Sequence, residues 1–151
     1  MTISDNIKYV GVNDHDIDLF EGQYVVPRGM AYNSYVVLGG EKSAVMDTVD
    51  ARFGDEWLAN VKAALGGKAP DYLVVQHMEP DHSANIAAFM DAFPQSKVVS
   101  SAPAFRMMKN FFDKEWEDRR VVVKEGDTLD LGGRALARLP RSAAHGAGPF
   151  C

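Results

Sequence analysis

The segment DYLVVQHMEPDHSA, residues 71–84, decides the fold and carries the chemistry of this chain. It opens with aromatic and β-branched residues (71–76) that predict a buried strand. Because Pro80 keeps the backbone around it extended, alternate side chains of the following loop can turn inward. Four side chains that can bind metal follow the strand within this loop: His77, Glu79, Asp81 and His82. We expect the first two to face one metal ion and the last two to face a second.

The mixture of ligand types narrows the choice of metal. Imidazole suits zinc, copper, iron and nickel, whereas carboxylates favour harder, oxygen-loving ions, so the set favours iron or manganese over a purely zinc site. Two ions close together can clamp or bridge a small oxygen-containing substrate. An alternative is that the same polar residues only cap a helix that starts near Ser83. The presence here of two of the chain's four histidines favours the metal site.

The rest of the chain predicts a layered α/β (α+β) fold. Apolar runs at 7–12, 23–26, 34–38 and 44–47 predict strands that turn residues separate, as in hairpins. Apolar residues spaced three or four apart predict helices around 53–65, 86–93 and 105–112, and further strands are predicted at 72–76, 97–100, 121–123 and 129–131. This order predicts a mixed sheet covered by helices. In such sheets ligands lie beyond the carboxyl ends of the strands, where residues 77–82 fall.

Size and charge exclude several function classes. The 151 residues suit one domain, and a net charge of -5 without a Lys/Arg cluster gives no reason to expect nucleic-acid binding. No apolar run approaches the ~20 residues that span a bilayer, so we expect no membrane insertion. The N-terminus shows no signal peptide. Cys151 is the only cysteine, which fits a reducing, cytoplasmic setting.

The order His77-x-Glu79-x-Asp81-His82 resembles the signature of the metallo-β-lactamase superfamily, in which the second position is usually histidine. With glutamate there, residues 74–83 are similar to the flavodiiron proteins, also called A-type flavoproteins. Further segments resemble the N-terminal domain of that family: residues 19–24, 32–35, 45–49, 69–72 and 127–134. The resemblance covers residues 1 to about 136.

The resemblance implies a metallo-β-lactamase-like αββα sandwich with a non-haem di-iron site, normally followed by a flavodoxin-like FMN domain. The family reduces dioxygen to water or nitric oxide to nitrous oxide, with electrons that reach FMN from rubredoxin or a similar donor. His77 and Glu79 would bind the first iron, and Asp81 and His82 the second. His145 lies near the place of the family's third histidine, but its Ala and Gly neighbours differ from the family pattern, and an exposed histidine in a disordered tail is the preferred interpretation. Asp47 resembles the superfamily's aspartate that braces the metal loop.

The resemblance ends where the composition changes. No Asp or Glu occurs from Arg134 to Cys151, and out-of-frame GC-rich DNA commonly encodes such an Arg/Ala/Gly/Pro tail, so we hypothesise a frameshift near residues 137–141. The family's bridging aspartate and last histidine would lie farther downstream. We therefore expect an N-terminal half-domain over 1–136 and a disordered tail over 137–151. A partial di-iron site and no FMN site would leave the chain inactive alone.

Half of a sandwich would expose apolar residues of its sheet. We expect Val74, Val98 and Val122, or their neighbours, to form a patch that causes homo-oligomerisation or aggregation. Two other functions stay open. One is a zinc-dependent metallo-β-lactamase-like hydrolase that uses zinc-activated water. The other is a non-catalytic module that pairs with a separately encoded second half.

Overall fold

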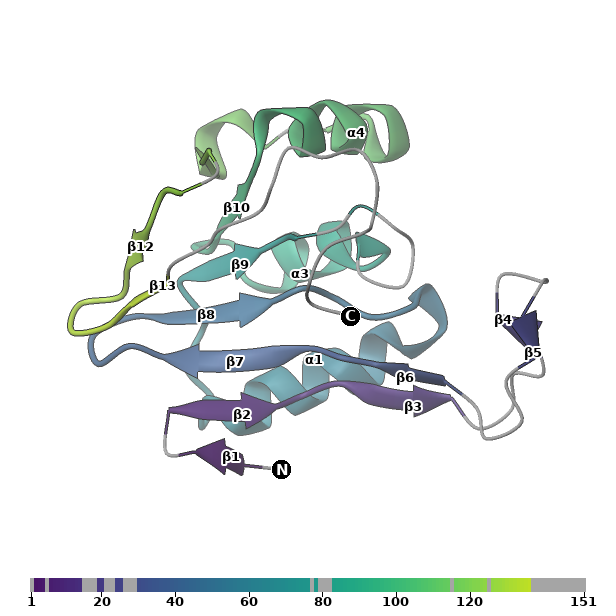
Figure 1. The fold of residues 1–151 in the computed structure, drawn as a ribbon, viewed down its shortest axis with the longest axis horizontal. Helices are drawn as coiled ribbons and strands as arrows, with labels where there is room; N and C mark the ends of the chain where they lie inside the picture. The colour runs from purple at the N-terminus through teal and green to yellow at the C-terminus, as the bar shows by residue number, and fades with distance from the viewer. Residues whose placement is uncertain are drawn as a thin grey trace.

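The computed structural model describes residues 2–4, 6–14, 19–20, 24–25, 30–76, 78, 83–114, 116–124 and 126–136. Within these residues, seven strands form one sheet in this order: β1 (Thr2–Ser4), β2 (Ile7–Tyr9), β7 (Tyr35–Leu38), β8 (Ser43–Met46), β9 (Tyr72–Val74), β10 (Lys97–Ser100) and β11 (Arg120–Val122) (Figure 1). The pairs from β1 to β8 are antiparallel, and those from β8 to β11 are parallel. The predicted mixed sheet and α/β class are confirmed.

The N-terminal strands form a long ribbon instead of the successive hairpins that the sequence predicts. Strand β2 pairs with β7, β3 (Val12–Asp14) with β6 (Met30–Tyr32), and β4 (Leu19–Phe20) with β5 (Tyr24–Val25). From the pair Ile7 and Val37 onward, the residue number rises by one on one strand as it falls by one on its partner. All described pairs of this ribbon therefore share one register. The hairpin expectation is correct for β7 and β8, which pair across the Gly39-Gly40 turn. It is wrong for the segment 7–12, because alternating apolar residues indicate that a strand exists but not which strand it pairs with.

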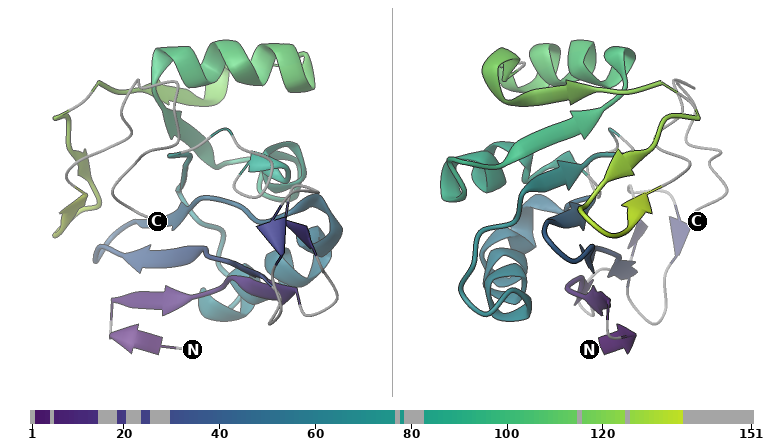
Figure 2. Two further views of the ribbon diagram at one scale, coloured as in Figure 1. Left: turned by 45° about the vertical axis from the view of Figure 1, so that its right-hand side comes forward. Right: turned by 90° about the vertical axis from the view of Figure 1, so that its left-hand side faces the viewer.

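Helices cover one face of the sheet (Figure 2). They are the 3₁₀ helix η1 (Ala51–Phe53), α1 (Gly54–Ala64), α3 (Ile86–Ala92) and α4 (Ala102–Phe112). Val45, Leu73 and Val98 point to this face and belong to the same core cluster as Trp57 and Phe89. The predicted helices are thus confirmed. Within the described residues, none of the helices combines the length and apolar character needed to cross a bilayer.

The opposite face packs against a hairpin formed by β12 (Leu129–Asp130) and β13 (Ala135–Leu136) (Figure 2). Val74 belongs to the same cluster as Leu129 and Leu131 and is completely buried. Val98 is also completely buried, because it points to the helices, while Val122 on the edge strand is 47% exposed. The expectation of exposure was therefore wrong for Val74 and Val98 and correct for Val122.

Arg119 lies in the short 3₁₀ helix η2 (Glu117–Arg119) and caps the end of α3. Its Nε donates to the Ser96 carbonyl at 3.0 Å, Nη1 to Met90 at 3.1 Å and Nη2 to Phe93 at 2.7 Å. Charge near a helix C-terminus and satisfied carbonyls both stabilise this end. The guanidinium therefore ties η2 to α3 and to the start of β10.

Arg119→Ala is expected to lower the free energy of unfolding by about 2 kcal/mol, because charged donors to three part-buried carbonyls are lost. Arg119→Lys should recover little of the lost stability, because a single ammonium group cannot reach all three carbonyls as the planar guanidinium does. Urea denaturation followed by circular dichroism measures the change. Arg106→Ala, on the exposed side of α4, is the control and should stay within about 0.5 kcal/mol of wild type. Equal effects of the two alanine variants would contradict the capping role.

Candidate metal centre

The candidate ligands His77, Glu79, Asp81, His82 and His145 all lie outside the described residues. Their role as metal ligands therefore stays a prediction. Within the described part of the chain, no group of three or more His, Cys, Asp and Glu side chains could hold a metal ion. What the structure does describe is the framework on both sides of residues 77–82. It lies at the carboxyl ends of the parallel strands β8, β9 and β10, as the sequence predicts.

Asp47 holds the chain just before the motif. It follows β8, is 7% exposed, and its Oδ1 accepts a hydrogen bond from the Gln76 backbone N–H at 2.7 Å. Its own N–H donates to the Val74 carbonyl at 2.9 Å. The φ of Asp47 is 61°, in the left-handed region that aspartate tolerates better than most residues. Asp47 thus holds Gln76, the residue before His77, by a hydrogen bond, and its role as the brace of a metal loop stays a prediction.

A chain of buried hydrogen bonds fixes the backbone of Asp47 from behind. The Ser34 hydroxyl donates to the Asp47 carbonyl at 2.9 Å, and the Trp57 indole N–H donates to the Ser34 oxygen at 2.9 Å. Ser34 and Trp57 are both completely buried. Because a hydroxyl has one proton, the indole donor leaves that proton free to be directed at Asp47. Helix α1 is connected in this way to the strand end that supports the motif.

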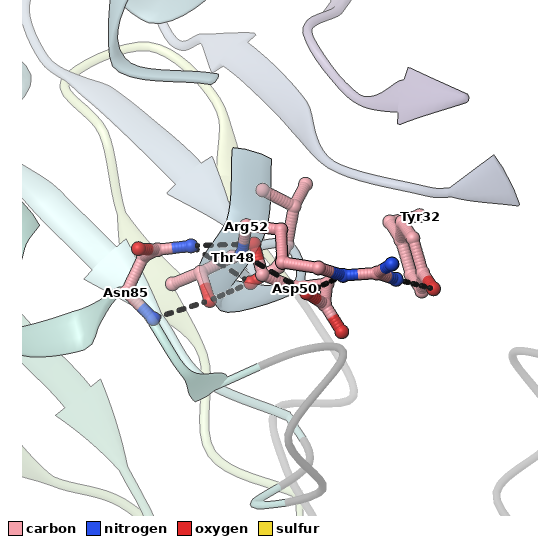
Figure 3. Close-up of polar contacts among 6 residues, drawn as sticks. Tyr32, Thr48, Asp50, Arg52 and Asn85 are labelled. Atoms are coloured by element: carbon pink, nitrogen blue, oxygen red, sulfur yellow. Dashed lines mark hydrogen bonds and ion pairs between the residues drawn. The ribbon is translucent and has the colours of Figure 1, made fainter. Parts of the chain in front are cut away.

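Asn85 holds the chain just after the motif (Figure 3). Its Nδ2 donates to the carbonyls of Val49 at 2.9 Å and Asp50 at 3.0 Å. Its backbone N–H donates to Thr48 Oγ1 at 3.3 Å. Asn85 is 6% exposed and Thr48 is completely buried, so these bonds form away from bulk water. The residues after β8 therefore receive hydrogen bonds from the far side of the motif as well.

Two serines complete the framework. The Ser83 hydroxyl donates to the Met78 carbonyl at 3.0 Å, which joins two positions inside the 76–85 stretch. The Ser100 hydroxyl, at the end of β10, donates to the Val75 carbonyl at 2.7 Å. Buried polar groups of this kind hold a site in place when every member is satisfied. Fixed backbone on both sides of a ligand motif is what a precise metal site requires.

The outer edge of the framework carries a charged pair. Asp50 Oδ1 accepts from the backbone N–H of Arg52 at 3.0 Å and from its Nε at 3.0 Å, and Arg52 Nη2 lies 3.4 Å from the Tyr32 hydroxyl (Figure 3). The Arg52 side chain is 53% exposed. Exposed pairs contribute roughly 0–1 kcal/mol. Asp50 therefore serves mainly as the N-cap of η1.

The sequence indicated some of this framework and missed the rest. Asp47 was expected from the resemblance, whereas Ser34, Thr48, Trp57 and Asn85 were not. Their contacts are hydrogen bonds to backbone atoms or to single hydroxyls far away in sequence, which leave no spacing pattern. The available signal was a polar residue at the end of an apolar run, which Asp47 is and which Thr48 follows.

Comparisons with known proteins agree with this geometry. A family model described as "ODP family beta lactamase" matches residues 30–151. The chain is 38% identical over 135 residues to the flavo-diiron protein FprA2 of Clostridium acetobutylicum, over 89% of this chain and 33% of that protein. It is 31% identical to the anaerobic nitric oxide reductase flavorubredoxin of Vibrio vulnificus over 146 residues, 95% of this chain and 29% of that protein.

The fold is similar to that of a solved structure, the rubredoxin oxygen:oxidoreductase from Desulfovibrio gigas. The TM-score is 0.83 at 35% identity, over 91% of this chain and 34% of that chain. The chain spans about a third of the length of the curated relatives that it matches. Because the family model covers residues 30–151, this protein belongs to the ODP family of β-lactamase-like domains, and the relatives that it resembles are flavodiiron proteins, as residues 71–84 predicted.

Proposed function

We propose that this chain forms the iron-binding part of a flavodiiron protein, with His77 and Glu79 on one iron and Asp81 and His82 on a second. The observation that supports this most is the framework of Asp47–Asp50, which hydrogen-bonds Gln76 before the motif and Asn85 after it. Such support has little purpose around a plain surface loop. The donor set fits the metal, since two imidazoles and two carboxylates suit iron.

The activity that we propose for the whole protein is the reduction of dioxygen to water or of nitric oxide to nitrous oxide. A di-iron centre, when bound, supplies the redox chemistry for this reduction. The relatives' names include a rubredoxin-oxygen oxidoreductase and nitric oxide reductase flavorubredoxins, which supports both substrates and a rubredoxin-like electron donor. FMN would pass the electrons. We propose that residues 1–136 form the N-terminal half of the di-iron domain and are inactive alone, in a reducing cytoplasmic setting.

The role of the chain's own groups follows from the framework. Asp47 fixes the backbone at Gln76 and Asn85 fixes it after Ser83, so both ends of the motif are held before metal arrives. Met78 and Ile86 belong to the apolar core under the helices, at 8% and 0% exposure, and keep water from this side of the motif. Preorganised, partly dry surroundings of this kind raise metal affinity.

Anaerobic titration of the chain with Fe(II), followed by iron analysis, tests the proposal. We expect up to two irons per chain, with His77→Ala/Glu79→Ala and Asp81→Ala/His82→Ala each removing one. His145→Ala shows whether His145 is a further ligand, which a roughly tenfold loss of affinity would establish. Unchanged iron binding in both double variants would contradict the assignment. Tight zinc binding with hydrolytic activity in place of iron binding would support the hydrolase, and co-purification with a second polypeptide would support the pairing module.

A further inference from the structure

We propose that Asn85 is a positioning residue for the ligands Asp81 and His82, and that Gly54 is glycine because Asn85 must fit against it. This inference rests on the proposed function. It starts from the two hydrogen bonds that the Asn85 side chain donates to consecutive carbonyls, Val49 at 2.9 Å and Asp50 at 3.0 Å. Asn85 comes three residues after His82, so these bonds fix the chain three residues from a proposed ligand of the second iron.

The packing of Gly54 gives independent support. Gly54 begins α1 with φ -57° and ψ -44°, ordinary right-handed helical angles that any residue adopts. Alanine has a higher helix propensity than glycine, so the helix itself favours a side chain here. A Cβ on residue 54 would lie 2.4 Å from Asn85 Oδ1 and 3.0 Å from its Cγ. The Asn85 amide is therefore what excludes a side chain.

The two positions are thus coupled. The amide is the end of a side chain and yields more readily than the backbone of α1, so an added methyl group at 54 would displace it. Displacement breaks the bonds to Val49 and Asp50 and leaves these buried carbonyls without that donor. Gly54→Ala should then reproduce the effect of Asn85→Ala. Once Asn85 is alanine, the methyl group at 54 has room.

A matched control exists in the same chain. Asn60 is half-buried. Its Nδ2 donates to two consecutive carbonyls, those of Val10 at 3.2 Å and Gly11 at 3.4 Å. The chemistry is that of Asn85, but the contact joins α1 to the end of β2, away from the motif. Asn60→Ala therefore measures the loss of such an amide without a change next to residues 77–82.

The test compares wild type, Asn85→Ala, Gly54→Ala, the double variant and Asn60→Ala. Fe(II) alone is the probe, bound anaerobically and removed by a chelator. We expect Asn85→Ala and Gly54→Ala each to weaken the second iron about tenfold, with the first iron retained. The double variant should be no weaker than Asn85→Ala, and Asn60→Ala should stay within about twofold of wild type. A purely structural role would weaken both irons equally, and additive single effects would contradict the coupling of positions 54 and 85.

Hydrogen exchange of the iron-free proteins supplies a second measurement. Amides of residues 83–86 should exchange at least about tenfold faster in Asn85→Ala than in wild type, and not in Asn60→Ala. Wild-type iron binding in Asn85→Ala, or in Gly54→Ala, overturns the inference and leaves the proposed function intact. If wild type itself binds no Fe(II), the proposed function fails. In that case unchanged exchange in Asn85→Ala overturns the positioning role, and faster exchange supports it.

Discussion

Trp57→Ala is expected to lower the free energy of unfolding by about 3–5 kcal/mol, the usual cost of a large aromatic lost from a core. Trp57 is completely buried, and its ring centre lies 5.8 Å from that of Phe89. The change also removes the indole donor to Ser34, whose hydroxyl holds the Asp47 carbonyl. Since small domains have only about 5–15 kcal/mol in total, the variant should be largely unfolded well below the wild-type melting temperature.

Trp57→Phe separates packing from hydrogen bonding. It keeps one aromatic ring but loses the indole N–H and part of the ring volume, so we expect a loss of about 1–2 kcal/mol. Urea denaturation with equal m-values for the three proteins measures the differences. If Trp57→Phe were as destabilised as Trp57→Ala, the indole N–H and not the ring would dominate. If Trp57→Phe cost nothing, the Ser34 contact would contribute nothing to stability.

Asp47→Ala is expected to weaken iron binding by about 10–100-fold, the usual effect of losing a group that orients metal ligands. Two effects combine in this variant. The Gln76 N–H loses its buried acceptor, and alanine must adopt a φ of 61°, which costs about 1–2 kcal/mol for a residue with a Cβ. Both effects act at the entry to the motif, so metal affinity and stability should fall together.

A series at position 47 separates the two effects. Asp47→Gly removes the acceptor but accepts the left-handed backbone, whereas Asp47→Asn keeps an acceptor oxygen and tolerates the same φ. We expect iron affinity to fall in the order wild type, Asp47→Asn, Asp47→Gly, Asp47→Ala. Competition with a chelator measures it. Iron affinity in Asp47→Gly equal to wild type would show that only the backbone conformation matters at this position.

The sequence predicts where helices and strands occur in this protein better than it predicts which strands pair and which side chains meet. The recurrence of Trp57 and Val61 and the glycines at 66 and 67, with φ of 61° and 87°, correctly predict α1 and its end. Pairing of β2 with β7 was missed, because turn residues at many places fit several pairings and only the folded chain selects one. The bonds of Asn85 were missed for a related reason. An amide that donates to carbonyls 35 and 36 residues away leaves no periodic trace in sequence.

The sequence indicates the motif more strongly than any other part of the candidate site, and its metal-binding role stays a prediction. Four possible ligands of three types in a short loop after a strand indicate metal from chemistry alone, and the glutamate at 79 indicates the family. The support around the motif depends on tertiary packing. Asp47 is the exception, because a polar residue at a strand end is visible in sequence.

The framework also bears on the order of synthesis. The hydrogen bonds described above on the two sides of the motif join residues between Ser34 and Ser100, with sequence separations such as 29 for Asp47–Gln76 and 37 for Thr48–Asn85. A nascent chain that has just cleared the ribosome past Ser100 already holds all of these partners. Since folding can begin at the N-terminus during translation, the support for a metal ion can assemble before β11 or any later residue has emerged from the ribosome.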